Sequence, residues 1–152
     1  MTEQMKSNGI TRQEWMGLLA RAPEDAMMPL WDRVADRPSF KWLRSPEIGG
    51  VMVRGRAGAI GAPFNLGEMT VTRCSLALED GTVGHGYVQG RSKPKAEAAA
   101  LIDALMQTEA ADRLTELVIT PLKTQMQDTS KARAAKAAAT KVEFFTLVRG
   151  ED

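Results

Sequence analysis

Residues 69–89, MTVTRCSLALEDGTVGHGYVQ, contain the strongest local folding signal in the chain. Their centre, Glu79-Asp80-Gly81-Thr82, carries the Asp-Gly pair that is typical of a tight turn between two antiparallel strands. The stretch therefore predicts a β-hairpin whose second strand is Val83–Gln89. The apolar side chains before the turn change phase along the first strand: Met69 and Val71, then Cys74, Leu76 and Leu78. This change indicates either a β-bulge near Arg73 or a strand that is buried on both faces.

Two helices are expected on the N-terminal side of the hairpin. Thr11 suits a helix N-cap, and apolar residues then recur at helical spacing: Trp15, Leu18 and Leu19. Pro23 ends this helix, and residues 24–36 are expected to form a second one with the apolar stripe Met27, Leu30, Trp31 and Val34. From Phe40 onward the apolar period shortens towards two, which indicates strands, and residues 57–63 are expected to connect them to the hairpin.

Helices are also expected after the hairpin. Gly90-Arg91-Ser92 leads into a helix that has Pro94 in its first turn and an apolar face of Ala98, Leu101, Ile102 and Leu105. Residues 110–117 and the alanine-rich residues 125–140 are expected to be helical, and residues 142–148 (VEFFTLV) are interpreted as a terminal strand. This order predicts an α+β fold, with an antiparallel β-sheet and a central hairpin packed against N-terminal and C-terminal helices.

Composition excludes several classes of site. The chain has 152 residues, a net charge of +1, one cysteine and one histidine, so an internal disulfide and a multi-histidine metal site are excluded. We expect neither nucleic-acid binding nor a membrane span, because the charge is nearly balanced and no long apolar run occurs. Without a secretory signal the protein is expected to be cytoplasmic. Residues 1–10 are expected to be disordered, and residues 11–152 to form a single domain.

Neither the glycines nor the single histidine and cysteine match a known catalytic motif. Gly84, Gly86 and Gly90 differ from the spacing of dinucleotide-binding loops, which favours turns and close packing. His85 has no evident Asp, Cys or Ser partner in the sequence, so packing is favoured over catalysis. Cys74 is interpreted as a small buried hydrophobe. No catalytic residue and no metal ligand is therefore predicted.

The start of the helix after the hairpin is a candidate phosphate-binding site. Backbone N–H groups at a helix start and nearby cationic side chains suit a phosphate or phosphonate oxygen. The candidate residues are Arg73, Gly90, Arg91, Ser92, Lys93 and Lys95. A solvated charge cluster, or one that pairs with acidic groups of another protein, is the alternative. Phe144 and Phe145 are candidate subunit-interface residues, and the alternative is that both rings are buried within this domain.

Several ungapped blocks, in order, resemble the PhnG family, a subunit of the bacterial carbon-phosphorus lyase system that lets cells use organic phosphonates as a phosphorus source. The blocks include TRQ with WM from Thr11, TVTR from Thr70, DGTVG from Asp80, VQGR from Val88 with Lys93, LIDALMQ from Leu101, PL from Pro121 and FFTLVRG from Phe144. They span nearly the whole chain. His85 lies where the family tends to carry an aromatic residue, which counts further against a catalytic role for it.

The resemblance implies a place in a multiprotein complex. The implied partners are the PhnH, PhnI and PhnJ subunits, two copies of each, together with the ATPase-like PhnK and PhnL proteins. The implied reaction makes α-D-ribose 1-methylphosphonate 5-triphosphate from ATP and methylphosphonate, with ATP as a substrate of the complex and no cofactor on this subunit. Because the chain is poor in catalytic groups, an assisting role in this transferase is favoured. The alternative is a purely structural adaptor that holds the other subunits together without touching substrate.

Overall fold

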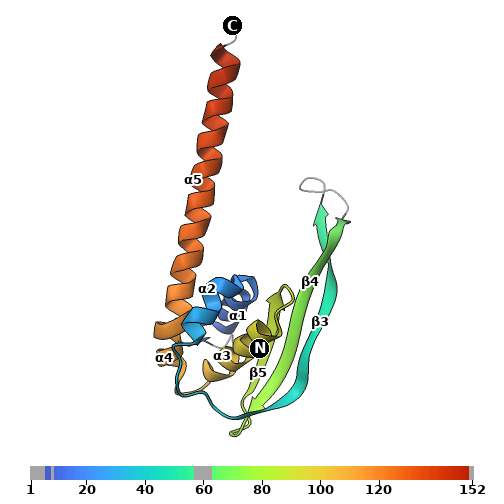
Figure 1. Cartoon of the computed structure of the whole chain (residues 1–152), viewed down its shortest axis with the longest axis vertical. Helices are drawn as coiled ribbons and strands as arrows, with labels where there is room; N and C mark the ends of the chain where they lie inside the picture. Colours follow the sequence, from blue (N-terminus) through green and yellow to red (C-terminus); the bar gives the residue numbers. More distant parts are fainter. Residues whose placement is uncertain (1–5, 8, 57–62, 151–152) are drawn as a thin grey trace.

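The computed structural model describes residues 6–7, 9–56 and 63–150, of which 6–7, 54–56, 63–66 and 141–150 are described by their backbone alone. Its main sheet has three antiparallel strands in the order β3-β4-β5 (Figure 1). They are β3 (Phe40–Arg56), β4 (Pro63–Leu78) and β5 (Val83–Gln89). The α+β class is confirmed. The connector expected at residues 57–63 lies outside the described residues except for Pro63.

The predicted hairpin is confirmed as β4 and β5. Ala77 pairs with Val83 at the turn, and Arg73 pairs with Tyr87 further along. Gly81 has a φ of 92°, a conformation that glycine adopts without steric cost. The N–H of Thr82 donates a hydrogen bond of 2.9 Å to Asp80 Oδ1, and this bond lowers the pKa of the exposed Asp80 carboxyl.

Burial on both faces, one of the two predicted alternatives, accounts for the phase change in β4: Val71 and Thr72 are both buried although they point to opposite faces of the sheet. A bulge does lie opposite Arg73, because between Arg44 and Glu47 β3 advances three residues while β4 advances only from Ser75 to Arg73. The extra residue belongs to β3, so the alternation of side chains in β4 is unchanged.

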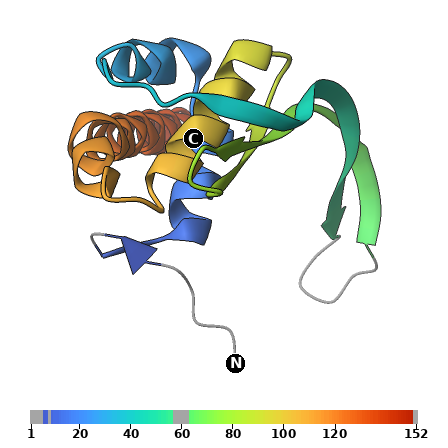
Figure 2. The ribbon, with the colours of Figure 1, turned by 90° about the horizontal axis from the view of Figure 1, so that it is seen from below.

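Helices cover one face of the sheet and enclose the core (Figure 2). They are α1 (Arg12–Arg21), α2 (Glu24–Trp31), α3 (Lys93–Leu105), α4 (Ala111–Leu114), the π-helical turn η1 (Thr115–Ile119) and α5 (Thr120–Gly150). The largest fully buried side chains come from the sheet and from most of these helices: Trp15, Leu19, Met27, Leu76, Ile102, Met106, Leu114, Ile119 and Leu122. None of the helices in the described part of the chain has the length and apolar composition that a membrane crossing requires.

The predicted N-cap at Thr11 is confirmed, and the structure adds a second one at Ser92. Thr11 Oγ1 accepts a hydrogen bond of 3.1 Å from the N–H of Glu14 at the start of α1. Ser92 Oγ accepts one of 3.1 Å from the N–H of Lys95 at the start of α3. The second helix is shorter than expected and ends at Trp31, although Val34 beyond it is still buried. A short ladder precedes α1, in which β1 (Lys6–Ser7) pairs with β2 (Ile10–Thr11).

The prediction of a terminal strand at residues 142–148 is wrong. These residues continue α5, which runs without interruption from Thr120 to Gly150. A run of seven residues does not distinguish strand from helix by its periodicity alone. Once the alanine-rich stretch before it is helical, each added residue extends an existing helix, which costs far less than starting a strand without a partner. Phe144 and Phe145 are therefore helical residues.

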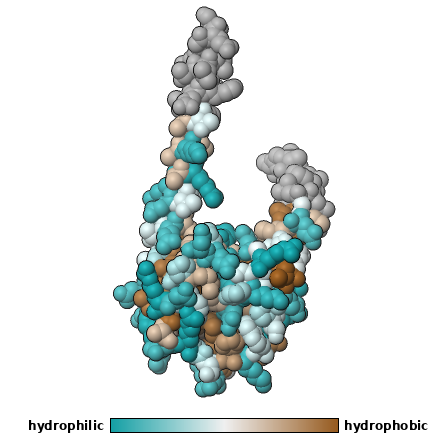
Figure 3. Space-filling view, in the orientation of Figure 1, coloured by the Kyte–Doolittle hydropathy of each residue, from teal (hydrophilic) through white to brown (hydrophobic). Residues whose placement is uncertain are grey.

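Two segments extend beyond the core at the same end of the molecule (Figures 1 and 3). One is α5, in which every side chain described from Gln127 to Thr140 is exposed. The other is the β3–β4 ribbon, where β4 residues before Val71 have no partner in β5. Met52, which pairs with Glu68 on this ribbon, is 55% exposed. Both segments therefore present side chains that the core of this chain does not cover.

Candidate functional site

The turn between β5 and α3 holds most of the predicted phosphate-binding residues in a fixed backbone. Gly90 has a φ of 95°, which favours glycine at this position. Its N–H donates a hydrogen bond of 2.9 Å to Thr70 O, and its carbonyl accepts one of 2.7 Å from Thr72 Oγ1. Both the N–H and the C=O of Gly90 are thus bonded to β4. Arg91 and Ser92 follow Gly90 and lead into α3.

Four of the predicted residues lie together at a cavity of about 560 Å³, here called the α3 pocket. These four are Gly90, Arg91, Ser92 and Lys95. Residues from the end of α1 and the start of α2 complete it, notably Arg21 and Glu24. Sequence reasoning missed both, because Glu24 is 68 positions from Ser92, whose hydroxyl donates a hydrogen bond of 2.8 Å to Glu24 Oε1. No local motif signals such a contact.

Lys95 is the most unusual residue of the α3 pocket. It is only 3% exposed, and among the described residues no hydrogen bond or ion pair to its ammonium group is found. Burial lowers the pKa of Lys95, and the nearby Glu24 carboxylate acts in the opposite direction. None of the described residues has a fully buried side-chain nitrogen or oxygen without a hydrogen-bond partner, so the Lys95 ammonium keeps contact with the α3 pocket, where it favours the approach of an anion.

The helix start contributes less than its sequence suggests. Pro94 has no N–H, and the N–H of Lys95 is already bonded to Ser92 Oγ. The α3 pocket therefore depends on side chains, with Arg21, Arg91 and Lys95 as cations and Glu24 as the opposing carboxylate. An incoming anion must compete with Glu24 for these cations.

Two of the predicted residues lie elsewhere. Arg73 is an exposed residue of β4 that pairs across the sheet with Glu47 and Tyr87, and it does not line the α3 pocket. Lys93 is exposed on the first turn of α3 and also does not line it. The candidate site is therefore smaller than the sequence indicated.

His85 has a partner that the sequence did not reveal. Ser75 faces it on the neighbouring strand, and His85 Nδ1 and Ser75 Oγ form a hydrogen bond of 2.9 Å on an exposed part of the sheet. The expectation that His85 has no serine partner was wrong, because ten residues separate the two and only the strand register brings them together. The described residues place no carboxylate in hydrogen-bonding contact with this imidazole, so the pair is not a catalytic triad.

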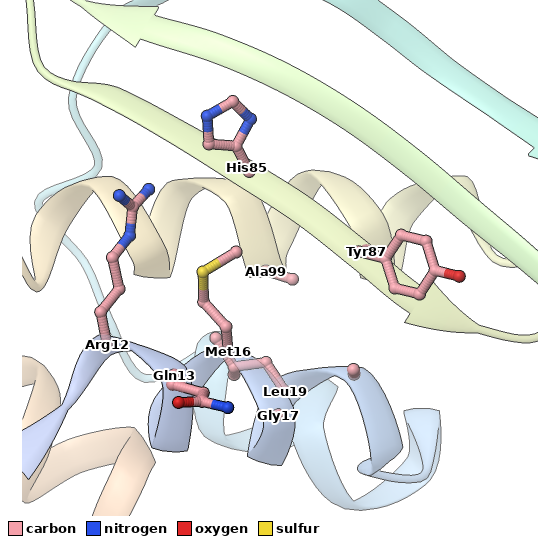
Figure 4. Close-up of a pocket in the computed structure, with 9 residues that line it drawn as sticks. Arg12, Gln13, Met16, Gly17, Leu19, His85, Tyr87 and Ala99 are labelled. Carbon is pink, nitrogen blue, oxygen red and sulfur yellow. The ribbon is translucent and has the colours of Figure 1, made fainter. Parts of the chain in front are cut away.

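A second cavity lies between α1 and β5 (Figure 4). This α1–β5 groove has a volume of about 600 Å³. Its lining includes Arg12, Met16, Gly17, His85, Tyr87 and Ala99. Most of these side chains are small or apolar, and Figure 4 shows Arg12 and Met16 reaching from α1 towards β5.

One buried carboxylate fixes the shape of this groove. Asp103 is 0% exposed and accepts hydrogen bonds from Arg12 Nε, Arg12 Nη2, Trp15 Nε1 and the backbone N–H of His85. Because these donors come from α1 and β5, Asp103 of α3 holds three elements at once. The hydrogen bonds to Asp103, together with the charge of that carboxylate, raise the pKa of Arg12 above its usual value, while burial acts in the opposite direction.

Cys74 and the nearby glycines serve packing, as expected. Cys74 is 2% exposed, donates a hydrogen bond of 3.2 Å from Sγ to Ala96 O, and has a pKa raised to about 11 by desolvation. A Cβ at Gly86 would lie 2.2 Å from Ala96 O, and one at Gly84 would lie 2.1 Å from Ala100 O. Both glycines thus allow α3 to lie directly against β5.

Comparison with known proteins agrees with the resemblance seen in the sequence. The model of the family described as phosphonate metabolism protein PhnG matches residues 10–150. The chain is 44% identical over 141 residues to "Alpha-D-ribose 1-methylphosphonate 5-triphosphate synthase subunit PhnG" of Rhizobium meliloti (strain 1021), a match covering 93% of this chain and 90% of that protein. The proteins that this α+β domain resembles are therefore proteins of phosphonate metabolism. The chain belongs to the PhnG family.

Proposed function

We propose that this chain is an assisting subunit of the synthase that makes α-D-ribose 1-methylphosphonate 5-triphosphate from ATP and methylphosphonate during the use of organic phosphonates. The observation that carries the proposal is the 44% identity to a subunit of that synthase over nearly the full length of both chains. The partners would be the PhnH, PhnI and PhnJ subunits, two copies of each, with the PhnK and PhnL proteins associated.

The chemistry of the described residues supports an assisting role. They contain no group of three or more His, Cys, Asp and Glu side chains that could hold a metal ion. The buried thiol of Cys74 is a poor nucleophile near neutral pH, because the thiolate is the reactive form and the pKa of Cys74 is about 11. The reacting groups would then belong to a partner subunit.

The α3 pocket would bind a phosphate or phosphonate oxygen of the substrates. Lys95 of α3, Arg91 just before this helix and Arg21 of α1 supply positive charge to its lining. Transfer to a phosphonate must compete with transfer to water, which is far more abundant, so the acceptor has to be positioned and water excluded. A subunit that closes over a partner's reaction centre with a basic pocket does both.

A purely structural adaptor is the second candidate. It is favoured by α5, whose described side chains from Gln127 to Thr140 have no cover within this chain. In this case α5 would carry the subunit contacts, with Phe144 and Phe145 as interface residues towards its end. No contact with substrate would be needed.

Two charge reversals in the same turn separate the candidates. Arg91→Glu changes a residue of the α3 pocket, and Lys93→Glu makes the same charge change outside it. Losing a charge-assisted hydrogen bond costs about 1.5–3 kcal/mol, so Arg91→Glu should reduce product formation by the complete synthase at least tenfold. Lys93→Glu should stay within twofold of the wild type. Both variants should still assemble, as judged by size-exclusion chromatography.

Equal activity of the two variants would remove the phosphate-binding role and favour the adaptor. Loss of assembly in Arg91→Glu but not in Lys93→Glu would place Arg91 at a subunit contact instead. The reaction is followed through adenine release together with phosphorus NMR, so that transfer to phosphonate is distinguished from hydrolysis.

A further inference from the structure

The outer edge of β5 is capped by side chains at its beginning. β5 is the last strand of the sheet, so its side away from β4 has no neighbouring strand. On that side the N–H of His85 donates a hydrogen bond of 2.9 Å to Asp103 Oδ2, and the carbonyl of Val83 accepts one of 2.9 Å from Gln107 Nε2. Asp103 near the end of α3 and Gln107 just beyond it thus occupy the place of a neighbouring strand over the first three residues of β5.

The rest of this edge has no such caps among the described residues. In an antiparallel ladder, every second residue directs its N–H and C=O to the same side. Because the N–H of His85 points outward, the N–H and C=O of Tyr87 and Gln89 point outward as well. Tyr87 lines the α1–β5 groove, and its ring is 42% exposed (Figure 4). Gln89, further along the same edge, lines the α3 pocket.

The wall of the groove opposite β5 is formed by α1 and contains a glycine, Gly17, that leaves space above the helix. Gly17 lies in the interior of α1, where glycine is less favourable than alanine. A Cβ added there would meet only Arg21 Nη1, at 3.3 Å, which is the end of a flexible side chain. Neither the packing of α1 nor its backbone conformation therefore requires glycine at this position. A polypeptide segment that passes close to α1 would require it, because any larger side chain would be in the way.

We propose that the α1–β5 groove accepts an extended segment of another subunit of the synthase, which pairs as an additional strand with Tyr87 and Gln89 of β5. Main-chain hydrogen bonds would hold the segment, as in other cases where a peptide adds to a sheet edge. The single guanidinium in the lining, that of Arg12, is already paired with Asp103. The groove therefore suits a segment with small or apolar side chains towards Met16 and Ala99 rather than a charged one. This inference rests on the proposed membership of the complex.

Substitution of Gly17 tests the groove without weakening the fold. Gly17→Gln adds a long side chain at a residue that lines both the α1–β5 groove and a second cavity beside Arg21 and Lys123, and glutamine is a better helix former than glycine. The variant should melt about 2–4 °C higher than the wild type and yet bind the other purified subunits at least tenfold more weakly. Gly17→Ala is the matched control, since it gains helix stability while leaving most of the groove open. It should bind like the wild type.

A second pair of variants tests the strand edge itself. Proline is tolerated on an edge strand when its nitrogen faces away from the sheet, so Gln89→Pro removes one outward N–H without breaking the ladder to β4. Gln89→Thr removes the same side chain but keeps the N–H. We expect Gln89→Pro to bind the other purified subunits at least tenfold more weakly than Gln89→Thr does. If the two variants differ in thermal stability, the concentration of folded protein is used in place of the total concentration when their affinities are calculated.

Residue-resolved hydrogen exchange completes the test. In the assembled complex, the amides of Tyr87 and Gln89 should exchange at least tenfold more slowly than in the isolated chain, while that of Gly86, which faces β4, should change little. Binding by Gly17→Gln that equals Gly17→Ala, with unchanged exchange at Tyr87, would overturn the inference. Slow exchange in the isolated chain, with dimers in sedimentation, would identify a second copy as the occupant and also overturn it. The proposed function is tested separately: it fails if the other subunits form the synthase product without this chain.

Discussion

Arg12 donates two hydrogen bonds to the buried carboxylate of Asp103, from Nε to Oδ1 at 3.1 Å and from Nη2 to Oδ2 at 2.8 Å. The two residues are 91 positions apart and join α1 to α3. The same carboxylate accepts from Trp15 Nε1 and from the N–H of His85. One acidic side chain thus sets the position of α1 relative to the edge of β5, and with it the width of the α1–β5 groove.

Asp103→Asn should therefore be strongly destabilising. The amide would place an NH2 group among four donors and remove the charge that balances Arg12. Breaking a buried ion pair from one side costs about 3–5 kcal/mol, and we expect the lower end because Arg12 is partly exposed. Urea unfolding followed by tryptophan fluorescence measures the change. A loss below about 1 kcal/mol would show that the pair is not a main determinant of stability.

Gly86→Ala should be at least as damaging. The added Cβ would lie 2.2 Å from Ala96 O and 3.0 Å from Cys74 Sγ, so α3 must move away from β5. We expect a loss of about 3 kcal/mol or more. Gly49→Ala is the matched control, because a Cβ there meets no atom within 4 Å. Equal thermal midpoints for the two variants would contradict the close contact between α3 and β5.

The buried thiol of Cys74 predicts a dependence of stability on alkaline pH. Burial raises the pKa of Cys74 in the folded protein to about 11, against 9.0 for an ordinary thiol, so the unfolded chain loses this proton first as the pH rises. The unfolded state then binds fewer protons, and stability falls between about pH 9 and pH 11, by about 2 kcal/mol for this group. Unfolding of the wild type and Cys74→Ala across this range measures the effect. Parallel curves would refute it.

Lys95→Met should stabilise the protein while weakening its function. Burial lowers the folded pKa of Lys95, so its protonation favours the unfolded state. This destabilisation is fully present at neutral pH and is relieved only as the pH rises towards the unfolded pKa. Methionine keeps much of the side-chain length without the charge. A higher urea midpoint together with lower synthase output would mark a residue kept for binding, whereas unchanged output would assign Lys95 to packing.

Local signals in the sequence predicted the elements that depend on neighbouring residues. Asp80-Gly81 located the β4–β5 turn, Thr11 located the start of α1, and Pro94 located the first turn of α3. Features that depend on distant residues could not be predicted. The strand register alone brings Ser75 to His85, and the packing of α2 against α3 brings Glu24 to Ser92. The end of α5 was misjudged because seven residues with two phenylalanines suit either a strand or a helix until the preceding helix is known.

The most direct test of the central claim is an omission assay. ATP, methylphosphonate and the other purified subunits are mixed with and without this chain, while adenine release and phosphorus NMR are followed together. We predict that α-D-ribose 1-methylphosphonate 5-triphosphate forms only when the chain is present, and that without it any ATP consumed is hydrolysed. The same yield of this product without the chain would contradict a role in the transfer reaction.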